Sequence, residues 1–302
     1  MKETGEVKII NRLFLDYWRS PKLKSGSIDE IYNNIEKLGS LREKRLKYKS
    51  KAYEYPYYNM LQAVETYHNA NYFKFYELYR SVISSINIQS YSSALLSGRA
   101  ILEHYAMLVY IGGKLDKLLK DKKYFEFTSQ LNLLTIPPIQ RKFLKKYKRI
   151  HVNDALKIMG ESFATEKSKA KKKKNAETIL KVYNDISEFI HPASPSFIMY
   201  EKQSLEQKKD DLSPLESEWV LSSAFSYNSE HTQTTVFQYL KLLLSWSDLL
   251  LESLELFNKS IISRLKDEKE KIILKYKNNP LEIQEKIEEH YNVSANQRKK
   301  SK

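Results

Sequence analysis

The chain has 302 residues, enough to bury a substantial core in one large or two moderate domains. It holds only seven glycines and eight prolines against 29% charged residues, and it has no cysteine, which excludes disulfides, thiolate metal sites and a cysteine nucleophile. Acidic and polar residues interrupt the first 18 residues, and no long apolar run occurs anywhere. We therefore expect no secretory signal, no transmembrane segment and a cytoplasmic location.

The first predicted helices span residues 9–19 and 28–37, and Ser27 and Glu30 form a capping box at the start of the second. A basic stretch covers residues 41–51. Apolar residues at helical spacing then predict helices at 56–67 and 72–86, which we expect to pair as a helical hairpin. The central helix, 91–111, is apolar on every side in its second half, so we expect it to be buried and to end at Gly112 and Gly113.

Residues 114–134 predict an amphipathic helix, and the lysine run near 166–175 is too uniformly charged to pack, so it predicts a loop. A helix at 176–191 ends before Pro192. Residues 192–230 indicate a long loop or two short ordered pieces. From residue 232, a heptad-like apolar seam predicts a long helix that becomes charged beyond Arg264, and a short helix is expected after Pro280.

Together these elements predict an all-α, multi-helix bundle with a buried central helix and a long C-terminal helix. We divide the chain into an N-terminal helical extension at 1–55, a main helical bundle at 56–276 and a basic tail at 277–302.

The formal net charge is +14, and its distribution is uneven. Between residues 141 and 174, thirteen lysines and arginines stand against three acids. Such clusters attract polyanions, although the same residues can serve only to solvate a surface. The candidate nucleic-acid-binding residues are Lys145, Lys146, Lys148, Arg149, Lys171, Lys172, Lys173 and Lys174.

Arg99 and Glu103 are the first candidates for chemistry, because they lie four residues apart on a helix face that they share with leucines. A charge is costly to bury unless it is paired and hydrogen-bonded. The pattern therefore predicts either a site that a neighbour or ligand completes, or a structural ion pair. His104 is a second candidate, with a packed core histidine as the alternative. His191 is a third, with a helix C-terminal cap as the alternative.

Tyr183, Ser187 and His191 follow one another at steps of four residues and form a polar strip. If this strip docks on the Arg99 face, Arg99, Glu103, Ser187 and His191 come together. No histidines and carboxylates occur at metal-ligand spacing, and no glycine-rich phosphate loop occurs, so we expect neither a metal nor a cofactor. The tyrosine-rich stretch 53–79 could stack nucleic-acid bases beside Lys74 and Arg80, although such a stripe more often lies in the core.

The segment Arg99-Ala-Ile-Leu-Glu-His104 resembles the motif of the HEPN superfamily, helical-bundle proteins that include many metal-independent RNases of toxin–antitoxin and phage-defence systems. The resemblance implies that Arg99 holds the scissile phosphate and that His104 transfers a proton, with the site at a homodimer interface and with a protein partner such as an antitoxin. Two features depart from it. Ala100 stands where many members keep a polar residue, and His104 is turned about 140° from Arg99 on a regular helix.

The sequence therefore favours an RNA-directed, HEPN-like defence or stress-response protein, with RNA preferred over DNA and with endoribonuclease activity as one form of the hypothesis. The alternative is a non-catalytic helical module that binds protein or nucleic acid and in which the pair of Arg99 and Glu103 is structural.

Overall fold

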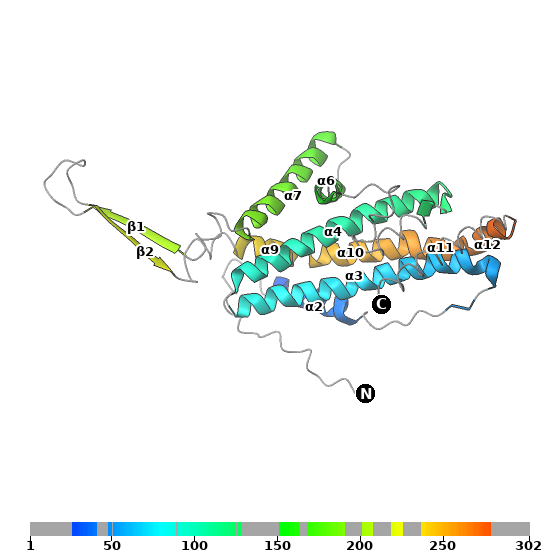
Figure 1. The fold of residues 1–302 in the computed structure, drawn as a ribbon, viewed down its shortest axis with the longest axis horizontal. Coiled ribbons are helices and arrows are strands. Elements are labelled where there is room, and N and C mark those ends of the chain that lie inside the picture. Colours follow the sequence, from blue (N-terminus) through cyan, green and yellow to red (C-terminus); the bar gives the residue numbers. More distant parts are fainter. Residues whose placement is uncertain are drawn as a thin grey trace, which may run out of the picture. The chain divides into compact units, whose positions relative to one another are not determined.

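The computed structural model describes residues 26–40, 48–49, 51–88, 90–124, 126–127, 151–163, 168–190, 201–207, 219–225 and 237–278 (Figure 1). Its helices are α2 (Gly26–Ser40), α3 (Tyr55–Asn87), α4 (Tyr91–Lys120), α6 (Val152–Ser162), α7 (Lys169–Ile190), α9 (Phe237–Ser245), α10 (Ser247–Phe257), α11 (Arg264–Asp267) and α12 (Lys269–Lys277), with a 3-10 turn η2 (Ala52–Glu54) and a π-helical turn η5 (Asn258–Ser263). These elements confirm the all-α, multi-helix bundle. No helix in the described ranges is both long and apolar enough to cross a membrane.

Two strands, β1 (Glu201–Gln207) and β2 (Trp219–Phe225), pair antiparallel with Glu201 opposite Phe225. They agree with the expectation of two short ordered pieces within 192–230. The helices predicted at 9–19 and after Pro280 lie outside the described residues, and so does the tail beyond residue 278.

The chain divides into two compact units. Unit 1 comprises Met1–Lys37, Phe75–Ala106 and Val152–Leu249, and unit 2 comprises Leu38–Lys74, Met107–His151 and Leu250–Lys302. Because the unit boundaries fall within α2, α3, α4 and α10, each of these helices contributes residues to both units.

In unit 1, tyrosine side chains fill much of the core and fasten α3 and α4 to the C-terminal helices. Tyr79 and Tyr105 are almost fully buried. The Tyr79 hydroxyl donates to the main-chain oxygen of Leu243 at 3.3 Å, and the Tyr105 hydroxyl donates to that of Leu249 at 3.0 Å. A buried hydroxyl without a partner is costly, so these bonds fix which turns of the helices face each other.

The helical hairpin expected from 56–67 and 72–86 is wrong, because α3 runs through both segments without a break. The polar residues between them contain no glycine or proline that would end a helix. His68 and Asn71 are buried, and the Asn71 side chain donates to the main-chain oxygen of Tyr67 at 2.8 Å. These residues therefore satisfy their polar groups within the helical core rather than forming a turn.

The expected helix end at Gly112 and Gly113 is also wrong, since α4 continues to Lys120 and neither glycine has a positive φ. A Cβ at Gly112 would lie 3.2 Å from the Phe257 ring in unit 2. Gly112 thus allows close packing rather than ending the helix. The central helix has no exposed residue between Ile101 and Gly112, but several of its residues there are only half-buried.

The expected basic loop near 166–175 is wrong from Lys169 onward, because α7 begins there. The structure also contains α6, which the sequence analysis did not predict. Its buried residues, Ala155, Leu156, Met159 and Gly160, recur at helical spacing, and this signal could have revealed the helix. Packing against α6 explains why the lysine run is ordered: Ala176 of α7 lies directly against Gly160.

The long C-terminal helix is present as separate segments from α9 to α12. Trp246 separates α9 from α10, and its N–H donates to the oxygen of Leu243 at 3.3 Å, a bond three residues back rather than four. Glu268, with φ of −88° and ψ of 5°, separates α11 from α12.

Gly160 and Gly113 provide a matched pair of variants. A Cβ at Gly160 would lie 2.6 Å from the Cα of Ala176, so we expect Gly160→Ala to lower the free energy of unfolding by about 1–3 kcal/mol. A Cβ at Gly113 would meet no atom within 4 Å, so Gly113→Ala should raise it by about 0.5–1 kcal/mol through helix propensity. Urea unfolding measures both. A Gly160→Ala protein as stable as wild type would contradict the close contact between α6 and α7.

Candidate functional site

The part of α4 in unit 1 carries Arg99 and Glu103 one turn apart, and α7 brings Tyr183 to them. Arg99 Nε donates to Glu103 Oε1 at 2.9 Å, and Arg99 Nη2 donates to the Tyr183 hydroxyl oxygen at 2.8 Å. The Tyr183 hydroxyl donates in turn to Glu103 Oε1 at 2.8 Å. These three side chains, which we call the Arg99 cluster, therefore close a triangle of hydrogen bonds.

The Arg99 cluster lies at the edge of the core, whereas the sequence suggested that the pair would be buried among leucines. The side chains of Arg99 and Glu103 are 25% and 38% exposed, and Leu96, one turn earlier on the same face, is 56% exposed. Tyr183 is buried. An ion pair this open to water contributes only about 0–1 kcal/mol by itself, so the hydrogen bonds of Tyr183 are what fix its geometry.

The protonation states of the cluster follow from these contacts. Burial alone lowers the pKa of Arg99, but the hydrogen bonds to Glu103 and Tyr183 and the Glu103 charge outweigh it and raise this pKa. Burial, followed by the hydrogen bond to Glu103, raises the pKa of Tyr183. At neutral pH, Arg99 is therefore a permanent cation and Tyr183 a neutral hydroxyl, both hydrogen-bonded to Glu103.

His104 does not share the Arg99 cluster. Its ring lies edge-on to Phe75 of α3, with the ring centroids 6.4 Å apart, whereas Arg99 contacts α7. This agrees with the turn of about 140° between the two residues on a regular helix. Within the described residues, the arginine and histidine of the HEPN-like segment therefore point to different neighbouring helices.

The expected cluster of Arg99 with Ser187 and His191 is only partly present. Helix α7 does dock on the Arg99 face, but through Tyr183. The Ser187 hydroxyl donates to the main-chain oxygen of Tyr183 at 2.7 Å, so Ser187 does not join. His191 lies outside the described residues.

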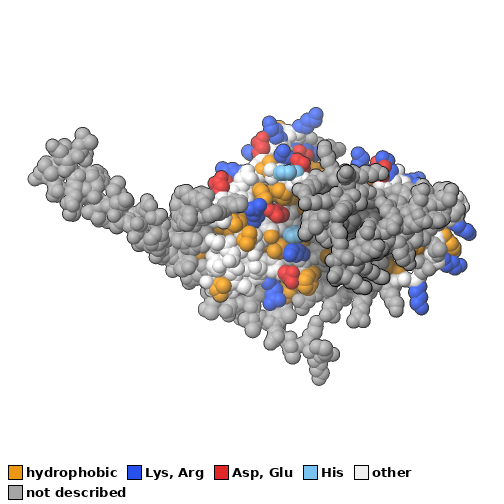
Figure 2. Space-filling model, in the orientation of Figure 1, with side chains coloured by type: hydrophobic (Ala, Val, Ile, Leu, Met, Phe, Trp, Pro, Cys, Tyr) orange, Lys and Arg blue, Asp and Glu red, His pale blue; other side chains and the backbone are white. Residues whose placement is uncertain are grey.

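The basic residues proposed to bind nucleic acid fall into two groups. Lys145, Lys146, Lys148 and Arg149 lie outside the described residues. Residues 171–174 lie in the first turns of α7, where lysine and arginine side chains gather at the top of Figure 2 with acidic side chains among them. Lys171, Lys173 and Lys174 are exposed, and Lys172 is half-buried.

The start of α7 has an unfavourable arrangement of charge. A helix N-terminus carries partial positive charge and favours acidic residues, but the first turn of α7 has none and is rich in lysine. Lys173 has an ion pair with Glu177 at 3.8 Å, yet both side chains are largely exposed, so this pair offsets little. A bound anion would lower the energy of this helix end.

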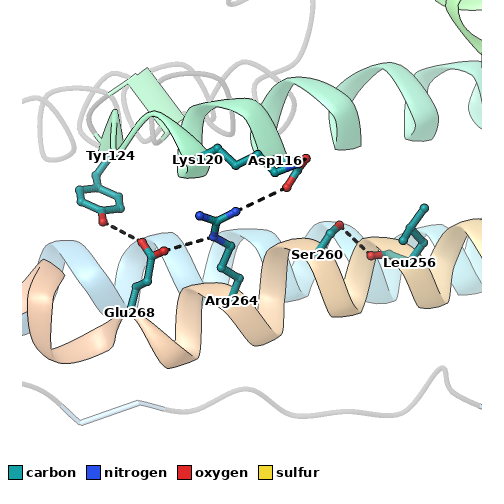
Figure 3. Close-up of polar contacts among 7 residues, drawn as sticks. All are labelled: Asp116, Lys120, Tyr124, Leu256, Ser260, Arg264 and Glu268. Carbon is teal, nitrogen blue, oxygen red and sulfur yellow. Dashed lines mark hydrogen bonds and ion pairs between the residues drawn. The ribbon is translucent and has the colours of Figure 1, made fainter.

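Unit 2 contains a second cluster in which an arginine and a tyrosine both donate to one glutamate, and the sequence analysis missed it. Arg264 Nε donates to Glu268 Oε1 at 3.1 Å, and the Tyr124 hydroxyl donates to Glu268 Oε2 at 2.8 Å. Figure 3 shows that Arg264 also faces Asp116, at 4.0 Å, and Asp116 pairs with Lys120 at 2.5 Å. We call these five residues the Arg264 cluster. Its arginine and glutamate have the same spacing as Arg99 and Glu103, and this signal could have revealed it.

The two clusters differ in how fully the arginine is neutralised. Arg264 lies between two carboxylates, whereas the described contacts of Arg99 include one. Burial alone raises the pKa of Glu268, but hydrogen bonds from Tyr124 and Arg264 outweigh it and lower this pKa. Two hydrogen bonds, to Glu103 and to the uncharged Tyr183 hydroxyl, orient the Arg99 guanidinium, whereas in the described part of the chain Arg264 makes one hydrogen bond, to Glu268, and faces a second carboxylate. Arg99 is therefore the better candidate for binding an anion.

No protein-family model matches this chain, and neither the curated proteins nor the solved structures gave a match. Among the described residues, no group of three or more histidines, aspartates and glutamates is placed to hold a metal ion. The chemistry of the site therefore rests on its geometry, and the HEPN-like resemblance stays a prediction.

Tyr239 of α9 holds this helix against α7, and the pH dependence of its hydrogen bond can be measured. Its hydroxyl donates to Asp185 Oδ2 at 2.6 Å, and burial followed by this hydrogen bond raises the pKa of Tyr239 from 10.0 to about 12. Folding favours the protonated Tyr239 hydroxyl. Its contribution to the free energy of unfolding is therefore complete below pH 10 and is lost as the pH rises toward 12. The difference in unfolding free energy between wild type and Tyr239→Phe, measured in urea, should be constant below pH 10 and shrink above it. A difference that grows there would contradict the assigned bond.

Proposed function

We propose that this protein is an RNA-directed, HEPN-like defence or stress-response protein in which the lysines at the start of α7 attract RNA and Arg99 binds one phosphate. The observation that carries the proposal is that one helix supplies both features: α7 begins with the lysines and contributes Tyr183, which holds Arg99. At 1.5 Å per helical residue, Lys173 and Tyr183 are about 15 Å apart along α7, a length that about four stacked nucleotides span.

The geometry of Arg99 suits a phosphate. A guanidinium is a planar group whose N–H donors match the oxygens of a phosphate, and it binds best when its orientation is already fixed. Glu103 and Tyr183 fix that orientation from the protein side, and the side chain still reaches solvent. Little conformational freedom is then lost when an anion binds.

RNA rather than DNA is proposed because of the HEPN-like resemblance, since lysine contacts to phosphates are themselves blind to sequence. The same resemblance extends the proposal to a homodimer and to a protein partner such as an antitoxin. Sequence-blind binding suits a protein that acts on RNA broadly.

Metal-independent RNA cleavage is the more specific form of this proposal. The half-exposed Glu103 carboxylate beside Arg99 favours it, because a carboxylate next to a bound phosphate can accept a proton. His104 packs against Phe75, so His191, which follows α7 directly in the sequence, is the histidine that we assign to proton transfer.

A non-catalytic helical binding module is the second candidate, and the closed triangle of the Arg99 cluster favours it. Each of Arg99, Glu103 and Tyr183 has a hydrogen-bond partner in the other two. Such a triangle can serve only to hold α4 and α7 together.

Removing lysines from α7 tests the binding step. We expect the variant with Lys171→Gln, Lys173→Gln and Lys174→Gln to bind RNA more weakly and to lower the slope of log affinity against log salt by about three, roughly one per phosphate contact. The matched control carries Lys117→Gln, Lys241→Gln and Lys259→Gln, which remove the same charge from exposed lysines elsewhere. Fluorescence anisotropy with labelled RNA measures both, and equal slopes for the two variants would contradict a site on α7.

Replacing the two arginines tests the phosphate site. Arg99→Lys and Arg264→Lys both keep the positive charge and remove the Nε bond to a glutamate. We expect Arg99→Lys to weaken RNA binding roughly tenfold, the usual effect of a lost hydrogen bond to a charged group, and Arg264→Lys to leave RNA affinity unchanged. If Arg99→Lys changes only the melting temperature, the cluster is structural.

Cleavage is measured on end-labelled RNA in the presence of EDTA. The endoribonuclease form of the proposal predicts that wild type cuts the RNA and that Arg99→Ala and His191→Ala abolish cutting, whereas His104→Ala does not. If the wild-type protein binds RNA but cleaves no RNA species, the endoribonuclease hypothesis is rejected and the non-catalytic binding module is retained.

A further inference from the structure

A surface of unit 2 combines tyrosine rings with lysines where η2, the start of α3 and α12 meet. The ammonium nitrogens of Lys51 and Lys277 lie 5.9 and 5.8 Å from the centroid of the Tyr53 ring. The ammonium nitrogen of Lys269 lies 5.5 Å from the centroid of the Tyr58 ring. We call these five residues the tyrosine–lysine surface. It is formed by segments that lie more than 200 residues apart in the sequence, since η2 packs against α12.

This surface is accessible and positively charged. Lys51 and Lys277 are exposed, and both tyrosines are partly exposed. Helix α12 reads KEKIILKYK, with four lysines and one glutamate, and its buried residues Ile272, Ile273 and Tyr276 recur at helical spacing on the other side. Glu54 and Glu270 lie near Lys269 and offset part of this charge, but the three lysines leave a net positive charge, so the surface favours an anionic ligand.

The three lysines lie near the tyrosine rings but make only long cation–π contacts with them. Lys114 sits 4.5 Å from the Tyr110 ring centroid, a close cation–π contact, whereas the three lysines of the tyrosine–lysine surface lie near the outer limit of about 6 Å for that interaction. The Lys269 ammonium group lies over the Tyr58 ring, and the neighbouring Tyr58 hydroxyl raises the pKa of Lys269.

Tyr53 is the ring best suited to receive a ligand. Tyr58 already stacks on Tyr48, with centroids 5.4 Å apart and planes inclined by 28°, and it also touches Tyr57. Among the described residues, Tyr53 contacts no other aromatic ring, and its ring contacts are those with Lys51 and Lys277. An aromatic ring flanked by mobile cations is how proteins bind single strands of nucleic acid: a base stacks on the ring while its phosphates pair with the cations. An acidic peptide would use the lysines but not the ring.

We propose that the tyrosine–lysine surface binds single-stranded RNA, with one base stacked on Tyr53 and the flanking phosphates paired with the three lysines. The choice of RNA as ligand rests on the proposed function, but the residues are separate from α7 and from the Arg99 cluster. Tyr58 positions Lys269 beside the strand and does not stack on a base.

The test uses the full chain and a labelled oligouridine, followed by fluorescence anisotropy. Tyr53→Leu keeps an apolar side chain but removes the flat ring, and we expect it to weaken binding at least about fivefold, whereas Tyr53→Phe keeps the ring and should bind like wild type. Lys277→Gln, at an exposed position that folding does not require, should lower the salt slope by about one. An abasic oligomer of the same length should bind equally to wild type and Tyr53→Leu.

Photocrosslinking gives a direct readout of stacking. An oligouridine carrying 5-iodouracil should crosslink to Tyr53 in wild type, and mass spectrometry of the digested protein should locate the crosslink there. If oligouridine binds wild type and Tyr53→Leu equally, with no crosslink at Tyr53, the inference is overturned. It is also overturned if polyglutamate displaces oligouridine equally well from both proteins, because the surface would then recognise charge alone.

The outcomes separate this inference from the proposed function. If the lysine variant of α7 weakens binding and Tyr53→Leu does not, the proposed function stands and this inference fails. If Tyr53→Leu weakens binding and the α7 variant does not, this inference stands and the α7 site fails. If wild type binds no RNA, both fail.

Discussion

A buried tyrosine hydroxyl has to donate its proton to an acceptor, and for Tyr79, Tyr105 and Tyr183 the acceptor belongs to another helix. The chain has 22 tyrosines, and the hydroxyls that tie separate elements together within a unit are those of Tyr48, Tyr79, Tyr105, Tyr124, Tyr183 and Tyr239. Burial of apolar surface favours compactness but not one arrangement of helices, because it has no direction. Each hydroxyl adds only about 1 kcal/mol, yet leaving one unpaired costs more, so these bonds select the helix registers.

The same constraint builds the candidate site. Arg99 and Glu103 would be an ordinary surface ion pair without Tyr183, whose hydroxyl accepts from one and donates to the other. In the Arg264 cluster, Tyr124 also donates to the glutamate, but the second group that faces the arginine is a carboxylate, Asp116. Arg264 thus faces two carboxylates, whereas the described contacts of Arg99 are one carboxylate and one tyrosine hydroxyl. That difference, rather than the ion pair as such, is the reason to assign function to Arg99.

The sequence was sufficient for features that depend on local spacing. Periodicity and composition predicted the all-α bundle and the helix at 176–191, and the four-residue step predicted the contact between Arg99 and Glu103. The sequence failed where a neighbouring element decides the local structure. Gly112 lies within α4, where it packs closely against Phe257, and Ala176 of α7 packs on α6 where a loop was expected. The sequence placed Tyr183 in the polar strip that docks on Arg99 but assigned the contact to Ser187 and His191, because a tyrosine among the apolar residues of α7 is equally typical of a core side chain.

The central claim is that Arg99 binds a phosphate of RNA while Arg264 does not. The most direct measurement follows the Nε–H resonances of the arginine side chains by NMR during a titration of ¹⁵N-labelled protein with a short RNA oligomer, assigned through Arg99→Lys and Arg264→Lys. The account predicts that the Arg99 resonance shifts in proportion to bound RNA and that the Arg264 resonance stays in place. Saturated RNA binding with an unmoved Arg99 resonance would contradict it.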